Sequence, residues 1–101
     1  MRRSLAGHGA ALIATALMMA LPGCAGAPVQ EMSDARQAIS AARAAGAAER
    51  APEPLTRATE LLASAEQALQ RHDYGTARRQ AEKAHAQAVT ALNLASQATK
   101  P

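Results

Sequence analysis

Apolar residues recur at alternating spacings of three and four from about residue 31 to residue 98, with polar and charged residues between them. This spacing puts the apolar residues on one face of an α-helix, which has about 3.6 residues per turn. Three such stripes follow one another, separated by short segments that contain glycine, proline or aspartate. The pattern predicts an all-α fold of three amphipathic helices.

The three helices are predicted at residues 31–45, 52–71 and 74–98. Gly46 fits the position after the first helix, where a left-handed backbone is common. Pro52 fits the first position of the second helix, where no N–H is needed. The stripes consist of Met32, Ala35, Ile39, Ala42 and Gly46 in the first helix, Leu55, Ala58, Leu62, Ala65 and Leu69 in the second, and Ala77, Ala81, Ala84, Ala88, Ala91, Ala95 and Ala98 in the third. The third stripe is an unbroken alanine heptad pattern, as in a closely packed coiled coil.

The connections between the helices are short. Residues 47–51 are predicted as a loop, and Asp73 is predicted to cap the third helix by accepting a backbone N–H. Helices joined by short loops pack antiparallel, so we expect leucines of the second helix to lie over the alanine seam of the third. The expected architecture is a small alanine-rich antiparallel helical hairpin or an up-down-up three-helix bundle.

The third helix is longer than its predicted neighbours. At a rise of 1.5 Å per residue it would reach about 37 Å, against about 30 Å for the second helix and about 22 Å for the first. Its C-terminal end, which carries Leu92 and Leu94, would then extend beyond the other helices. We interpret these leucines as a candidate surface for another copy of the chain or for an envelope protein. The alternative is a frayed, solvated end.

A different pattern occupies the N-terminus. The basic start Met1-Arg2-Arg3 is followed by an apolar run over residues 10–21 and by small residues around Cys24. Basic residues, a short apolar segment and small residues are the layout of a secretory signal peptide. A membrane-spanning helix needs about 20 apolar residues. The shorter run therefore favours a cleaved signal at residues 1–23 over a permanent transmembrane helix.

The segment Leu21-Pro22-Gly23-Cys24 resembles the lipobox of bacterial lipoproteins, although Pro22 stands where a small residue is usual. The resemblance implies that the Cys24 thiol takes a diacylglycerol, that the chain is cut before Cys24, and that the new N-terminus is acylated, for example with palmitate. Several acyl chains on one residue would give a stable anchor. Ala25, in place of an aspartate, implies the outer membrane in enterobacterial lipoproteins. The alternative is an ordinary secretory signal with an incidental cysteine.

Composition narrows the functional classes. The sequence has 101 residues, one tyrosine, no tryptophan and no phenylalanine, and its formal net charge is +3. Arg2 and Arg3 account for two of these charges, so residues 24–101 would carry +1. Mixed charges and a single aromatic residue argue against nucleic-acid binding, which calls for a basic face with stacking residues. One cysteine excludes an intrachain disulfide.

The sequence contains no recognisable catalytic, metal-binding or cofactor-binding motif. His72 and His85 lack the neighbouring cysteines or carboxylates from which a metal site is built. No glycine-rich phosphate loop or serine elbow is present. We therefore expect neither an enzyme nor a small-molecule substrate.

Arginines recur at multiples of seven residues within the predicted helices. A basic stripe on each helix could meet anionic lipid or cell-wall polymer, and a solvated flank of mixed charge is the alternative. The arginines are Arg36, Arg43, Arg57, Arg71 and Arg78.

Three blocks of residues carry a family resemblance. They are Asp34-Ala35-Arg36-Gln37-Ala38-Ile39, then Ala45-Gly46-Ala47 with Ala51-Pro52, and last Leu69 followed by Asp73-Tyr74, Ala77-Arg78 and Ala81-Glu82-Lys83-Ala84. Over roughly residues 31–95 the chain resembles the bacterial family called domain of unknown function 4398. That family often has glycine before Asp-Tyr, where this chain has His72, so we expect the turn to differ there. The resemblance implies an envelope protein, frequently a lipoprotein, and no established activity.

Lys100 suggests a second function. The major alanine-heptad lipoprotein of enteric bacteria ends in a lysine that is joined to peptidoglycan, and Lys100 stands next to Pro101 at the end of this sequence. It is a candidate attachment residue on this resemblance alone.

The predicted organisation is a signal peptide at residues 1–23, a lipidated tether at 24–30 and a helical bundle at 31–99. The predicted protein is an outer-membrane lipoprotein that faces the periplasm and serves as a structural or protein-interaction scaffold. The alternative is an accessory subunit associated with peptidoglycan.

Overall fold

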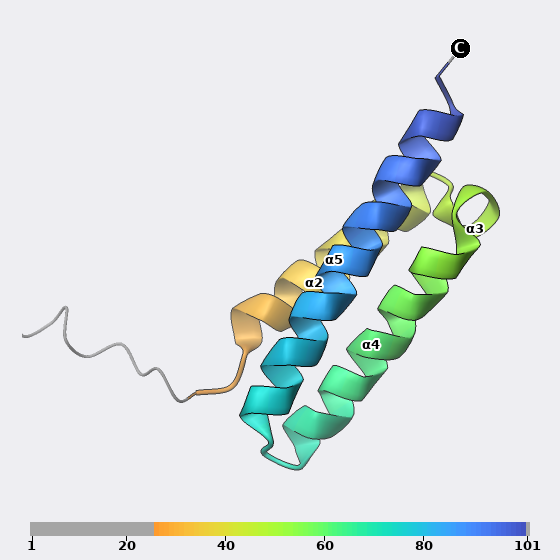
Figure 1. Ribbon diagram of the computed structural model, residues 1–101. Coiled ribbons are helices and arrows are strands. Elements are labelled where there is room, and N and C mark those ends of the chain that lie inside the picture. The colour runs from red at the N-terminus through yellow and green to blue at the C-terminus, as the bar shows by residue number, and fades with distance from the viewer. Residues whose placement is uncertain (1–25, 101) are drawn as a thin grey trace, which may run out of the picture.

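The computed structural model describes residues 26–100 of the chain. Its helices are α2 at Val29–Ala44, α3 at Ala47–Arg50, α4 at Pro52–Gln70 and α5 at Tyr74–Ala98. α2 and α5 run in one direction and α4 runs back in the other (Figure 1). The architecture is the predicted up-down-up bundle, with α3 as a short additional helix between α2 and α4.

The central helix of the bundle is α5. It packs against α4 on one side and against α2 on another, whereas α2 and α4 contact each other much less. The alanines of its seam are fully buried from Ala77 to Ala95, which confirms this part of the predicted heptad pattern. Ala98, the last residue of the predicted seam, is exposed because α5 has by then passed the ends of its neighbours.

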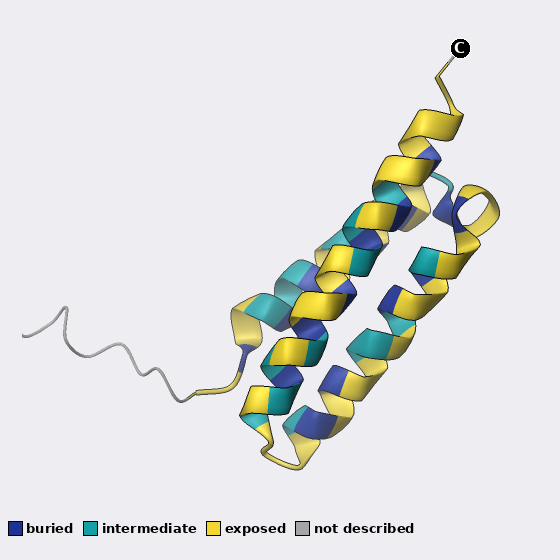
Figure 2. Cartoon of the chain, in the orientation of Figure 1, coloured by how far each residue is buried: buried dark blue, intermediate teal, exposed yellow. Residues whose placement is uncertain are grey.

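Buried side chains form two clusters along this seam, and Figure 2 shows them on the inward faces of the helices. The cluster nearer the α2–α4 connection consists of Ile39, Ala42, Ala47, Ala51, Leu55, Ala58, Ala88, Ala91 and Ala95, and the other of Met32, Ala65 and Ala81. The leucines of α4 cover the seam less completely than predicted. Leu55 is buried, but Leu62 and Leu69 are only partly buried, and Ala68 occupies the core beside Leu69.

The boundaries of α2 differ slightly from the prediction. The helix begins at Val29 rather than Glu31, and the buried Pro28 immediately precedes it. After α2 ends, Gly46 adopts a left-handed backbone with φ of 86°, and its N–H donates to the Arg43 carbonyl at 3.0 Å. This confirms the predicted role of Gly46 as the residue that stops the helix.

The segment 47–51 was predicted as a loop, and that prediction was wrong for most of it, because α3 occupies Ala47–Arg50. Ala47 is fully buried against the C-terminal part of α5. Arg50 donates through Nη1 to the Ala45 carbonyl at 3.2 Å, one of the carbonyls left open at the end of α2. A helix of four residues has no periodicity to detect, and its burial depends on contact with a distant part of the chain.

Candidate functional site

The predicted lipid-attachment residue, Cys24, and the other lipobox residues, Leu21, Pro22 and Gly23, lie outside the described residues. The described chain begins at Gly26, only two residues after Cys24. We call the part of the bundle around this point the entry end and define it as residues 26–31 and 69–79. It combines the start of α2, the α4–α5 turn and the start of α5 (Figure 1).

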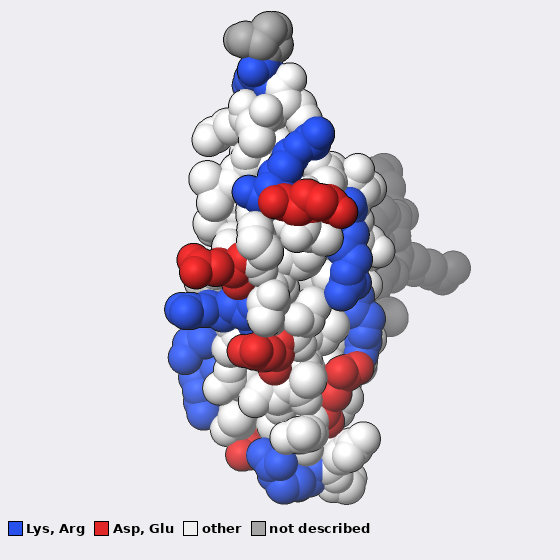
Figure 3. All heavy atoms as spheres, turned by 90° about the vertical axis from the view of Figure 1, so that its right-hand side faces the viewer, with Lys and Arg blue, Asp and Glu red and all other residues white. Residues whose placement is uncertain are grey.

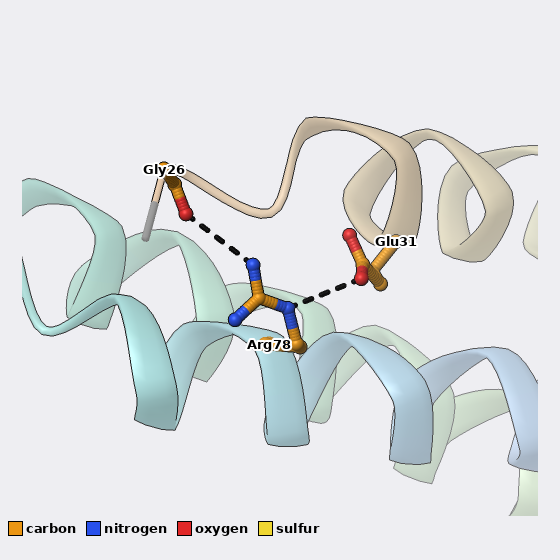
Figure 4. Close-up of polar contacts among 3 residues, drawn as sticks. All are labelled: Gly26, Glu31 and Arg78. Carbon is orange, nitrogen blue, oxygen red and sulfur yellow. Dashed lines mark hydrogen bonds and ion pairs between the residues drawn. The ribbon is translucent and has the colours of Figure 1, made fainter. Parts of the chain in front are cut away.

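Arg78 joins the parts of the entry end (Figure 4). Its Nε donates to Glu31 Oε2 at 3.1 Å, and its Nη2 donates to the Gly26 carbonyl at 3.3 Å. The two charged side chains are 35% and 31% exposed, so part of their surroundings is protein rather than water. Partial removal from water strengthens the attraction between opposite charges. Arg78 thus links α5 to α2 and to the segment that leads toward Cys24.

The residues before α2 pack against the bundle. Pro28 is fully buried, and the N–H of Val29 donates to the Ala27 carbonyl at 2.8 Å. Gln30 already belongs to α2. The folded unit therefore includes most of the described part of the segment interpreted as a tether at residues 24–30.

The α4–α5 turn has the hydrogen bonds of a Schellman motif. The N–H of His72 donates to the Leu69 carbonyl at 3.0 Å, and the N–H of Asp73 donates to the Ala68 carbonyl at 2.9 Å. His72 sits in the left-handed region with φ of 62°, a conformation that costs roughly 1–2 kcal/mol for a residue with a Cβ. Histidine here takes the conformation for which glycine is ordinarily used, at the position where the family resemblance implies glycine.

Asp73 begins α5, as predicted. Its Oδ1 accepts the N–H of Thr76 at 3.3 Å, which is the hydrogen bond of a helix N-cap. Hydrogen bonds from Thr76, followed by the positive charges of Arg71 and Arg79, hold the pKa of the Asp73 carboxyl below its ordinary value. The same residue therefore ends α4 through its backbone and starts α5 through its side chain.

The predicted overhang of α5 is shorter than expected. Ala95 is still fully buried, and Leu92 packs against the core because α3 and its flanking residues reach this part of α5. Leu94 is 45% exposed and is the more accessible of the two leucines proposed as an interaction surface. It lies in a shallow groove between α4 and α5 that is lined by Glu53, Pro54, Arg57, Gln87, Thr90 and Leu94.

Lys100 follows the end of α5, and its backbone N–H donates to the Gln97 carbonyl at 3.2 Å. Arg78 lies at the opposite end of the same helix, about 33 Å away at 1.5 Å per residue. Lys100 is thus remote from Gly26, the first described residue, which Arg78 contacts.

The charged residues form a mixed surface. Figure 3 shows acidic and basic side chains alternating over the α4 side of the bundle. Arg36 pairs with Glu66 at 3.2 Å in a pair that is about half exposed, and Arg78 pairs with Glu31. Two of the arginines assigned to basic stripes therefore have their charge neutralised by a nearby carboxylate. This agrees with the alternative prediction of a solvated flank of mixed charge.

Neither histidine belongs to a recognisable metal centre in the described structure. His72 and His85 are exposed, and His85 borders a depression between α2 and α5 together with Glu31, Asp34 and Glu82. Within residues 26–100, no group of three or more His, Cys, Asp or Glu side chains is placed to hold a metal ion. None of the helices in this range has the length and apolar character needed to cross a membrane.

The sequence analysis missed the linking role of Arg78, which it placed in a basic stripe. One signal was present, because Arg78 directly follows Ala77 and thus lies at the edge of the alanine seam. A long side chain in this position can reach a neighbouring helix. Its contacts with Gly26 and Glu31 span 52 and 47 residues, so only the folded structure reveals them.

Comparison with curated proteins and with solved structures found no match. The family described as "Domain of unknown function (DUF4398)" matches residues 30–100. The matched segment begins in the first turn of α2 and ends just after α5, so it coincides with the helical bundle. On this match the chain belongs to the DUF4398 family.

Proposed function

We propose that the protein is a bacterial envelope lipoprotein, held at the outer membrane through Cys24 and facing the periplasm. The observation that carries this proposal is the position of Cys24. It follows a segment with the layout of an export signal and lies two residues before Gly26, whose carbonyl accepts a hydrogen bond from Arg78. Two extended residues reach roughly 7 Å, so an acylated Cys24 would bring the bundle directly to the membrane surface.

We further propose that the bundle works as a structural or protein-interaction module rather than as an enzyme. The alanine seam of α5 is occupied by α2 and α4, which leaves the outer helix faces for other molecules. Leu94, in the groove between α4 and α5, is the apolar side chain best placed for a second copy or another envelope protein.

The intact mass of the protein purified from membranes, with peptide maps of both ends, tests the anchor. We expect a chain that starts at Cys24 and carries a diacylglycerol adduct. The variant Cys24→Ser should retain residues 1–23 and lack the adduct. An unmodified Cys24 in the natural protein, or cleavage at another bond, would contradict the lipoprotein proposal.

A second candidate function is attachment to the cell wall. It is favoured by the position of Lys100, which lies beyond the end of α5 that is remote from Gly26. Digestion of isolated sacculi should then release a C-terminal peptide that carries a muropeptide on Lys100, and Lys100→Arg should abolish it. Recovery with sacculi without a covalent adduct would instead indicate an accessory subunit that binds peptidoglycan non-covalently.

A further inference from the structure

The outermost part of the entry end is the α4–α5 turn, and it carries an excess of positive charge. Arg71 at the turn and Arg79 in the second turn of α5 are both exposed, and Arg79 Nη2 donates to Thr76 Oγ1 at 3.1 Å. Asp73 lies between them and is engaged as the cap of α5. Arg78, the third arginine of this end, is already paired with Glu31. Two arginines therefore face solvent against one carboxylate at the tip of the bundle.

The same end presents side chains suited to a membrane interface. Val29 is 73% exposed at the start of α2. Tyr74, the one aromatic residue of the sequence, is partly exposed at the start of α5, with its ring centroid 5.9 Å from that of His72. Tyrosine favours the boundary between hydrocarbon and water because its ring is apolar and its hydroxyl is polar. Basic side chains are attracted to anionic headgroups beside them.

We propose that the entry end rests on the membrane surface, with Arg71 and Arg79 toward anionic lipid headgroups, and that Arg78 fixes this orientation. This inference rests on the proposed anchoring through Cys24 and names the partner of the entry end as the bilayer itself. The short separation in sequence between Cys24 and the described bundle supports the bilayer as the partner. Only Ala25 separates Cys24 from Gly26, so an acyl anchor leaves the entry end nearest to the lipid.

Arg78 acts in this arrangement as a positioning residue. An acyl anchor on a free linker would let the bundle tumble above the membrane. By holding the Gly26 carbonyl and Glu31 from α5, Arg78 couples the anchored segment to the long axis of the bundle. The axis of α5, about 37 Å long, then points away from the membrane, and Leu94 and Lys100 lie on the remote side.

Two matched cysteine variants of the full chain test this orientation. Gln70→Cys places a thiol at the entry end, and Gln97→Cys places one in the last turn of α5; both positions are exposed. Since the Cys24 thiol would be blocked by its lipid, each variant has one free thiol for a fluorophore. The labelled lipoproteins are reconstituted into vesicles of brominated phosphatidylcholine, with and without phosphatidylglycerol. We expect bromine to quench the label at position 70 several-fold more than the label at position 97.

Equal quenching at the two positions, or stronger quenching at position 97, would overturn the orientation. The intact mass of the same samples separates this failure from failure of the anchor. A sample without the lipid adduct contradicts the proposed function, whereas a lipidated sample with equal quenching contradicts only the present inference.

Substitutions in the labelled Gln70→Cys and Gln97→Cys chains test the cause of the orientation. Phosphatidylglycerol should increase the quenching at position 70, and Arg71→Gln with Arg79→Gln should remove this increase. Arg78→Gln should bring the quenching at positions 70 and 97 closer together, and Arg36→Gln, which breaks an ion pair outside the entry end, should leave the difference intact. Circular dichroism of each variant verifies that the helices remain. If neither the double variant nor Arg78→Gln alters quenching in a folded protein, the proposed roles of these arginines are wrong.

Discussion

The two ends of the bundle are closed by different interactions. At the end remote from Gly26, α3 and its flanks bury Ala47 and Ala51 in the cluster that also contains Ala91, and Gly46 makes the turn. At the entry end, a single arginine connects three segments through hydrogen bonds. The first closure depends on small side-chain volume and the second on particular donors and acceptors, so the two ends should respond to different substitutions.

Enlarging a buried side chain at the end remote from Gly26 should have the largest effect on stability. Ala91→Leu adds three heavy atoms to a fully buried position between helices, and overpacking of this kind costs about 1–3 kcal/mol. Urea unfolding followed by circular dichroism should show the corresponding loss in the free energy of unfolding. Ala98→Leu, one heptad later on the same helix and exposed, should leave stability nearly unchanged. Equal effects at the two positions would show that the seam is not tightly packed.

The two left-handed turn residues should respond in opposite directions. Gly46→Ala forces a Cβ into φ of 86° and to 3.0 Å from Arg50 Nη1, so we expect a loss of about 1–2 kcal/mol. His72→Gly relieves the same kind of strain at the other end, and part of this gain is offset by the greater freedom of glycine in the unfolded chain. A net gain of about 0.5–1 kcal/mol is expected. Thermal unfolding of both variants and of the natural chain shows whether each substitution raises or lowers stability. If His72→Gly lowers stability, the imidazole makes a favourable contact in the folded protein.

Removing the polar connection at the entry end should have a moderate effect. Arg78→Gln breaks the contact with Glu31 and weakens that with Gly26, and we expect a loss of about 1 kcal/mol, since the pair is partly solvated. Arg36→Gln breaks the more exposed pair with Glu66 and should cost less than about 0.5 kcal/mol. A double-mutant cycle of Arg78→Gln with Glu31→Gln isolates the coupling. A coupling of zero would show that the contact between Arg78 and Glu31 adds nothing to stability.

The smallest expected effect is the pH dependence of stability that comes from Asp73 in the α4–α5 turn. The pKa of Asp73 is lowered in the folded protein, so its ionised form stabilises the fold above the pKa of the unfolded chain, about 3.9. This contribution is lost as the pH falls through the lower folded value. Asp73→Asn keeps the cap but cannot titrate. Urea unfolding at neutral pH and at about pH 2 measures the loss of stability on acidification. This loss should be smaller for the Asp73→Asn variant than for the natural chain.

Most of the helical architecture could be predicted because local signals agree. The alanine pattern of α5, Pro52 at the start of α4 and Asp73 at the start of α5 each predict the same boundary as the structure. α3 could not be predicted, since its burial of Ala47 depends on α5, which is distant in sequence. The left-handed backbone of His72 was hidden for a related reason. A positive φ is uncommon for any residue with a Cβ, so the residue type does not predict it, and the hydrogen bonds of the turn impose it.

The candidate site could be predicted only in part. Residues around Cys24 carry a local signal. For Arg78, the local sequence indicates only a place at the edge of the alanine seam and does not identify Gly26 and Glu31 as its partners. Leu92 and Leu94 were predicted to share one environment. They differ because the helical surface turns by about 200° between positions i and i+2, which places Leu92 against the core and Leu94 toward solvent.

The alanine core also sets how the fold responds to temperature. Each buried methyl removes little apolar surface from water, and apart from Pro28 the larger apolar side chains that are buried among residues 26–100 are Met32, Ile39 and Leu55. The heat-capacity change on unfolding grows with the apolar surface that becomes exposed, and averages about 12–15 cal/mol/K per residue in globular proteins. This bundle should fall below that range. Its stability curve would then be low and broad, with little difference between a cold and a warm environment.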